Sequence, residues 1–140
     1  MKVHRLKVHR PVICLAIALA LIPIGIAWRL APLHLPPFLY KYGGSVLWAA
    51  MVYWLVAAAL PRLDPVRVAG LAAVIAALVE CSRLIHTPSL DAFRITLAGK
   101  LILGRFFSGK DIAAYWLAIF ACAAVDRWAD RWVLSKRIRV

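Results

Sequence analysis

Side chains that could form a binding site are concentrated in one stretch that follows an apolar segment. Residues 79–94 read "VECSRLIHTPSLDAFR" and contain charged groups of both signs and a histidine, namely Glu80, Arg83, His86, Asp91 and Arg94. Carboxylates accept hydrogen bonds or act as general bases, and a guanidinium can hold a phosphate or a carboxylate through paired N–H groups. This stretch is therefore the first candidate for a functional site.

Two further side chains are expected at the same membrane depth. Asp111 begins the last apolar segment, and Tyr115 lies one turn further along the same helix face. Glu80 lies roughly 21 Å into its helix, inside the hydrocarbon region, where an unpaired carboxylate is costly. Arg83, three residues on, is its nearest partner. The sequence predicts a ligand-binding pocket near the outer membrane surface, formed by Glu80, Arg94, Asp111 and Tyr115, with His86 and Asp91 beside it.

Neither a metal site nor a cofactor is predicted from these residues. The acids and His86 lack the i, i+4 histidine pair or the H-E-x-x-H pattern that zinc sites use. Glu80 or Asp111 could serve as a general base, but no serine lies in a nucleophile motif, so the sequence leaves catalysis open. His86 and Asp91 taken singly are more typical of a solvated loop.

The composition is that of an integral membrane protein. Of the 140 residues, 64% are hydrophobic, and the mean hydropathy is +0.81, too apolar for a soluble domain of this size. At about 20 residues per spanning helix, the length allows about four helices. We predict an all-α fold, an integral membrane bundle in one transmembrane domain over residues 1–140, with four transmembrane helices at about 11–28, 45–60, 66–84 and 111–133.

A fifth, shorter helix is predicted at about 88–104, between the third and fourth spanning helices. Thr87 can cap this helix and Pro88 can be its first residue, while Lys100 and three glycines argue against a full span. We therefore expect an interfacial or re-entrant helix packed over the bundle. The breaker-rich segment "PLHLPPFLYKYGG" is expected to be an ordered loop, and the first apolar segment a retained helix and not a cleaved signal peptide.

The net charge of +12 is placed where it would set membrane topology. Basic residues cluster at both ends of the chain, next to apolar segments, and no aromatic-rich soluble surface accompanies them, which argues against nucleic acid as a partner. With the amino terminus in the cytoplasm, eleven of the 18 Lys and Arg residues lie inside. We predict a multi-pass protein of the bacterial inner (cytoplasmic) membrane with both termini cytoplasmic.

Two segments resemble a known family. "KYGGSVLWAAMVYWL" and "ECSRLIHTPSLDAFRITLAGKLILGRFFSGKDIAAY" are similar to DUF2809, a family of small bacterial membrane proteins, over about residues 29–115. More distantly, the acid, the arginine and the aspartate of the last helix resemble VanZ-like membrane proteins, which implies a link to glycopeptide resistance and the cell envelope. Two positions depart from the DUF2809 pattern, since Arg83 stands in place of glutamine and Gly44 in place of an aspartate.

The leading functional hypothesis is a pocket that binds a phosphate-bearing lipid or a cell-envelope precursor, with Arg94 meeting the anion. Its partners would be membrane lipids or a lipid-linked ligand. The alternative is a non-catalytic interaction or scaffold protein that contacts another membrane protein, or a second copy, through the small residues at 70, 72, 73, 76 and 77. In that alternative, the charged residues are structural ion pairs. A proton or ion pathway is disfavoured because the ionisable groups cluster at one membrane face.

Overall fold

The fold consists of four long helices and two short ones. The computed structural model describes residues 3–104 and 106–138, and this part of the chain is helical without strands, which confirms the predicted all-α fold. The helices are α1 (Val3–Leu30), α2 (Pro37–Ala59), α3 (Pro65–Ser82), α4 (Pro88–Arg94), α5 (Leu97–Ile102) and α6 (Gly109–Ile138).

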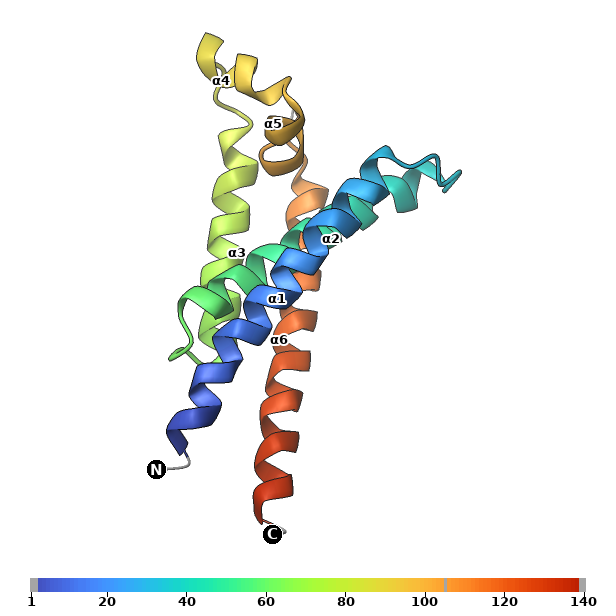
Figure 1. The fold of residues 1–140 in the computed structure, drawn as a ribbon. Coiled ribbons are helices and arrows are strands. Elements are labelled where there is room, and N and C mark those ends of the chain that lie inside the picture. The colour runs from blue at the N-terminus through green and yellow to red at the C-terminus, as the bar shows by residue number, and fades with distance from the viewer. Residues whose placement is uncertain (1–2, 105, 139–140) are drawn as a thin grey trace.

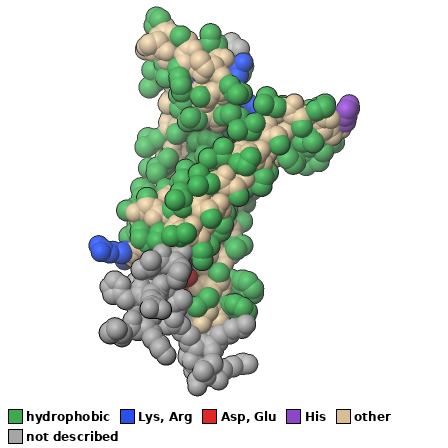
Figure 2. Space-filling view, viewed as in Figure 1, with side chains coloured by type: hydrophobic (Ala, Val, Ile, Leu, Met, Phe, Trp, Pro, Cys, Tyr) green, Lys and Arg blue, Asp and Glu red, His purple; other side chains and the backbone are tan. Residues whose placement is uncertain are grey.

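Four of these helices are long and apolar enough to cross a membrane, namely α1, α2, α3 and α6. Their outward faces carry large apolar side chains, such as Leu117 with 74% and Leu78 with 65% of its surface exposed. The space-filling view likewise shows hydrophobic side chains over most of the visible face (Figure 2). Lipid is the environment in which such a surface is stable, so the chain is a multi-pass membrane protein.

The helices form two pairs that cross obliquely. Helix α1 packs against α2, α3 packs against α6, and α2 contacts both members of the second pair. The α1–α2 pair leans away from the α3–α6 pair at the end where α4 and α5 lie (Figure 1). We call this the α4–α5 end. The start of α1 and the end of α6 lie together at the other end, the terminal end.

Small side chains bring the helices close together in the core. Ala72 and Ala76 of α3 and Ala49 and Ala57 of α2 are fully buried, and Tyr53 is the largest buried side chain among them. Without bulky groups at the crossing, backbones approach closely and gain van der Waals contact, which is the main attraction between helices in lipid. Ala72 and Ala76 of α3 are thus used for packing within one molecule.

A buried polar network ties the terminal end together. Arg10 of α1 donates to Asp126 of α6 at 2.9 Å and to the carbonyls of Pro61 and Leu63 in the α2–α3 turn. The Tyr53 hydroxyl donates to the same Asp126 oxygen at 2.8 Å. Asp126 is 5% exposed, and its contacts join three helices and a turn.

Helix α2 begins earlier than the sequence suggested. The segment expected to be a loop is helical from Pro37, because a proline at the first helical position lacks an N–H that would have no partner there. Trp28 of α1 covers Gly43 of α2, where a Cβ atom would lie 2.3 Å from the indole ring. Trp28 also donates to the Tyr40 carbonyl. These contacts seal the α1–α2 hairpin at the α4–α5 end.

The segment between α3 and α6 forms two short helices where one was expected. Thr87 caps α4, which begins at Pro88, and this confirms the predicted cap. The second helix has a cap of its own, because the Thr96 side chain accepts from the Gly99 backbone N–H at 3.0 Å. A Cβ atom on Gly99 would lie 2.0 Å from the Phe93 carbonyl oxygen, so only glycine lets α5 fold back onto α4.

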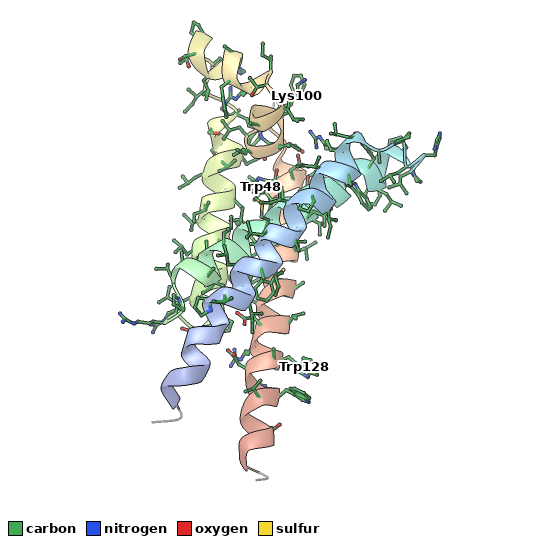
Figure 3. The ribbon with its side chains drawn as sticks, viewed as in Figure 1. Trp48, Lys100 and Trp128 are labelled. Atoms are coloured by element: carbon green, nitrogen blue, oxygen red, sulfur yellow. The ribbon has the colours of Figure 1, made fainter. Side chains whose placement is uncertain are left out.

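Tryptophans occupy two different environments. Trp48 lies among the helices near the α4–α5 end, whereas Trp128 projects outward from α6 towards the terminal end (Figure 3). Trp128 is 66% exposed. An outward tryptophan near a helix end is typical of the membrane–water interface, and Trp128 has this position. Trp48 is instead part of the site described next.

Candidate functional site

Glu80 is the centre of a hydrogen-bonded cluster at the α4–α5 end. Its carboxylate is fully buried, and both oxygens have partners. Oε1 accepts from Arg83 Nη1 and from the Ser108 backbone N–H, each at 2.8 Å, and Oε2 accepts from the Tyr115 hydroxyl at 2.9 Å. Helix α3 positions the acid, and the start of α6 brings its partners to the same depth.

Arg83 links this acid to the segment that follows α5. Its Nε donates to the Leu103 carbonyl, and Nη1 donates to the Phe106 carbonyl at 3.2 Å. Gly104 has a φ of +67°, and a Cβ atom there would lie 2.8 Å from the centre of the guanidinium. Glycine therefore allows the chain to wrap around the arginine side chain. Arg83 is thus held on several sides and acts as a structural cation.

Asp111 is buried near two cations but is incompletely satisfied. It is 5% exposed, with Oδ2 3.7 Å from Arg83 Nη1 and Oδ1 3.9 Å from Lys41 Nζ. At these distances both contacts are ion pairs, and neither is a hydrogen bond. Oδ1 accepts no hydrogen bond from the residues that the structure describes. A buried carboxylate oxygen thus remains able to accept from another group.

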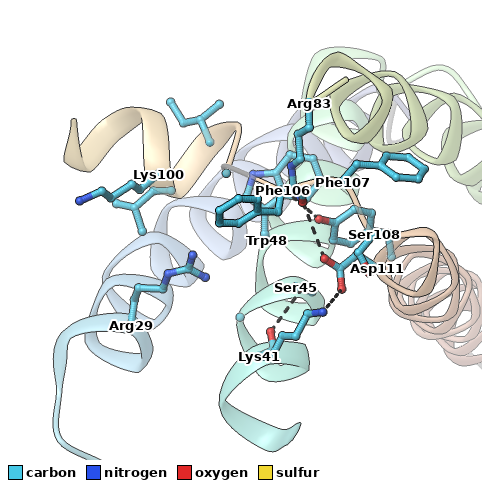
Figure 4. A pocket seen from close by; sticks show the side chains of 15 residues that line it. Arg29, Lys41, Ser45, Trp48, Arg83, Lys100, Phe106, Phe107, Ser108 and Asp111 are labelled. Atoms are coloured by element: carbon cyan, nitrogen blue, oxygen red, sulfur yellow. Dashed lines mark hydrogen bonds and ion pairs between the residues drawn. The ribbon is translucent and has the colours of Figure 1, made fainter. Parts of the chain in front are cut away.

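Arg83, Asp111 and Tyr115 line a polar cavity of about 400 Å³. Figure 4 shows Lys41 reaching towards Asp111, with Arg29 of α1 on another side and Lys100 of α5 extending away from Asp111. We use "polar cavity" for the space lined by Arg29, Lys41, Gly44, Ser45, Trp48, Arg83, Lys100, Leu101, Ile102, Gly104, Phe106, Phe107, Ser108, Asp111 and Tyr115.

An apolar groove of about 410 Å³ adjoins the polar cavity. The two share Arg29, Gly44 and Trp48, together with two residues of α5. We use "apolar groove" for the space lined by Leu21, Ile22, Gly25, Ile26, Arg29, Gly44, Leu47, Trp48, Met51, Leu55, Ala98, Leu101 and Ile102. The polar cavity therefore lies beside an apolar groove between α1, α2 and α5.

Cations outnumber anions in the polar cavity. Arg83 is paired with Glu80, and Lys41 is the partner of Asp111, whereas Arg29 and Lys100 form no ion pair with any described carboxylate. Arg29 is the more informative of the two, because it lies at the junction of the polar cavity and the apolar groove. The electrostatics of the chamber favour an anion.

A comparison with known protein families identifies the family of this chain. A family model described as "Protein of unknown function (DUF2809)" matches residues 34–119, more than half of the chain. The protein belongs to the DUF2809 family. No solved structure matches it. In this DUF2809 protein the matched region includes Glu80, Asp111 and Tyr115, but Arg29 lies before it.

The DUF2809 protein brings together only some of the predicted site residues. Glu80, Asp111 and Tyr115 converge as expected, and Arg83 pairs with Glu80 as its nearest partner. The expectation that Arg94 lies between the two acids is wrong. Arg83 occupies that position, because three residues along α3 already bring its guanidinium to the carboxylate.

Arg94 instead belongs to the connection between α3 and α4. It is 2% exposed and donates to the Ser82 and Ile85 carbonyls, at 2.5 and 2.8 Å, and to Asp91 at 3.1 Å. The carbonyls after the last turn of a helix lack intrahelical donors, and a cation there also complements the helix dipole. His86 lies 3.4 Å from Asp91 and is exposed, so these three residues form a separate cluster outside the polar cavity.

Several cavity residues were not found from the sequence. Arg29, Lys41 and Trp48 were not among the predicted site residues. Their convergence depends on the crossing of the two helix pairs, which no local pattern encodes. Among the described residues, no three His, Cys, Asp or Glu side chains are grouped as metal ligands would be.

Proposed function

We propose that this protein binds an anionic amphiphile, a phosphate-bearing lipid or cell-envelope precursor, at the α4–α5 end. The headgroup would occupy the polar cavity and an acyl or prenyl chain the apolar groove. The observation that carries the proposal is the position of Arg29, an arginine without a carboxylate partner at the junction of the two spaces. An amphiphile has the same junction, where its anionic group meets its hydrocarbon chain.

The charge balance supports an anion and not a neutral headgroup. The described lining of the polar cavity includes four cationic residues, Arg29, Lys41, Arg83 and Lys100, and one carboxylate, Asp111. Glu80 is not part of this lining, because it is fully buried and paired with Arg83. An arginine holds phosphate oxygens through paired N–H groups. A phosphate diester or monoester would bring the chamber closer to neutrality.

The apolar groove supports a ligand with a long hydrocarbon chain. Apart from Arg29, its lining is made of apolar side chains and glycine, from α1, α2 and α5. Gly44 lines both the groove and the polar cavity and contributes no side chain between them. A soluble phosphate would use only the polar cavity and leave the groove without a role.

Binding is favoured over catalysis by the state of Glu80. Each of its oxygens already accepts hydrogen bonds, and the carboxylate is fully buried against Arg83, Tyr115 and the Ser108 backbone. A general base must reach the proton it removes, and this carboxylate is occupied. Glu80 is better suited to holding Arg83 and the wall of the polar cavity in place.

The scaffold alternative has less support from the small residues of α3. Ala72, Ala73 and Ala76 are buried inside the bundle, where they contact the molecule's own helices. These residues are not free to pack against a partner. Of the five small residues of that alternative, Gly70 is exposed and Ala77 is half-buried, so a scaffold contact through α3 would have to use these two.

Native mass spectrometry of the detergent-purified protein tests the proposal. We expect dioleoyl phosphatidylglycerol to bind more tightly than dioleoyl phosphatidylcholine, and Arg29→Gln to weaken the first about tenfold, the effect of losing a charge-assisted hydrogen bond. Arg62→Gln is the matched control, because Arg62 is exposed in the turn at the terminal end. Equal binding of both lipids, unaffected by Arg29→Gln, would contradict the proposal.

A further inference from the structure

The unused acceptor of Asp111 indicates what the headgroup carries besides its anion. We propose that the ligand has a hydroxyl-bearing headgroup, a phosphate-linked polyol or sugar, whose O–H donates to Asp111 Oδ1. This inference rests on the proposed function, because it assigns the chemistry of a ligand already placed in the polar cavity.

Asp111 is buried with one carboxylate oxygen unsatisfied by the residues that the structure describes. The residue is 5% exposed and lines the polar cavity, yet Oδ1 accepts no hydrogen bond from the described residues. A buried carboxylate oxygen without a donor is costly, and nearly all such atoms in proteins have a partner. Asp111 lines the polar cavity, so the cavity is the side from which a bound molecule could supply the missing donor.

Two cations, Lys41 and Arg83, lie beside this carboxylate. Lys41 Nζ is 3.9 Å from Oδ1 and Arg83 Nη1 is 3.7 Å from Oδ2, so neither donates a hydrogen bond in this arrangement. Both nevertheless place positive charge beside the carboxylate. An ammonium headgroup at Oδ1 would meet repulsion from these two cations, whereas a neutral hydroxyl would not. The local charge therefore favours a hydroxyl donor over an amine.

Arg29 and Asp111 line the polar cavity from different helices. Arg29 comes from α1 and Asp111 from the start of α6, and both line the same cavity from different helices (Figure 4). An anion near Arg29 and a donor near Asp111 would then be different parts of one headgroup. Glycerol or sugar hydroxyls attached to a phosphate diester have this separation of acceptor and donor.

A pair of lipids that differ only in hydroxyl groups tests the inference. Dioleoyl phosphatidylglycerol and dioleoyl phosphatidylpropanol have the same charge and chains, but the second lacks headgroup hydroxyls. We expect the wild-type protein to bind phosphatidylglycerol about tenfold more tightly, the size of one hydrogen bond to a charged group. In Asp111→Ala the ratio should fall to about one, while Arg62→Gln should keep the wild-type ratio.

The outcomes separate this inference from the proposed function. If wild-type protein binds both lipids equally and Arg29→Gln weakens both, the hydroxyl assignment is wrong but the anionic site stands. If Arg29→Gln weakens neither lipid, the anionic site itself is wrong. Tighter binding of dioleoyl phosphatidylethanolamine than of phosphatidylglycerol would show that the donor to Asp111 is an amine and not a hydroxyl. The wild-type ratio decides the question even if Asp111→Ala does not fold.

Discussion

Arg83 Nη1 lies 2.7 Å from Glu80 Oε2, and this ion pair is almost fully removed from solvent. The Glu80 side chain is fully buried and the Arg83 side chain is 11% exposed. Two charges in such a place are stable only together, because each one alone would pay the cost of leaving water without compensation. The pair joins the end of α3 to the segment before α6, and so it shapes the wall of the polar cavity.

The first prediction concerns the removal of the acid. Glu80→Leu leaves Arg83 and Tyr115 without their acceptor, and we expect a loss of about 3 kcal/mol or more in the free energy of unfolding. Glu80→Gln keeps an oxygen for the Ser108 N–H and should lose less. Thermal unfolding in detergent measures both. Equal stability of the two variants would show that the carboxylate is not paired inside the membrane region.

The second prediction concerns Arg94, which the structure places in the α3–α4 connection. In Arg94→Ala the Ser82 and Ile85 carbonyls lose their donors, so we expect hydrogen exchange in residues 83–90 to rise about tenfold. His86→Ala, which removes an exposed side chain of the same cluster, is the control. Lipid binding should weaken much less than in Arg29→Gln. Lost binding with unchanged exchange would instead place Arg94 on the ligand.

The third prediction concerns the space beside Gly44, where a side chain could be added. A Cβ atom there would lie 3.6 Å from Arg29 Nη1, an ordinary contact, so a side chain fits. Gly44→Asp should place a carboxylate beside the guanidinium, satisfy Arg29 within the protein and abolish the preference for phosphatidylglycerol. Gly44→Asn has the same shape without the charge and should retain more binding. Equal affinity in the two variants would mean that Arg29 does not hold the anion.

The sequence was sufficient for contacts that depend on local helix geometry. Glu80 and Arg83 are three residues apart on one helix, so their pairing follows from the spacing. The Thr87–Pro88 helix start follows in the same way from capping preferences. Asp111 and Tyr115 reached the depth of Glu80 because the segment lengths fixed where each helix enters the membrane.

Contacts that depend on the path of a loop or the crossing of helices could not be predicted. Arg94 could have reached either acid or the helix end, and the backbone carbonyls of Ser82 and Ile85 leave no mark in the sequence. Arg29 and Asp111 are far apart along the chain, and only the tilt of the α1–α2 pair brings them to one cavity. Gly104 was a partial signal, since a glycine in such a segment often permits a close approach.

The fourth prediction is the orientation in the membrane. The start of α1 and the end of α6 lie at the same end of the molecule (Figure 1), as an even number of spans requires. From the charge distribution we expect the α4–α5 end on the outer side of the inner membrane. In a cysteine-free background, Ser89→Cys in α4 should react with an impermeant external reagent, and Arg62→Cys should not. The reverse pattern would invert the orientation.

The central claim is that one amphiphile occupies the polar cavity and the apolar groove together, and photo-crosslinking tests it most directly. A phosphatidylglycerol with a diazirine in one acyl chain is bound to the purified protein, irradiated and mapped by peptide mass spectrometry. We predict crosslinks concentrated on groove residues such as Leu21, Met51 and Leu55, and their loss in Gly44→Asp. Crosslinks spread evenly over lipid-facing residues such as Leu78 and Leu117, and unchanged in that variant, would contradict the account.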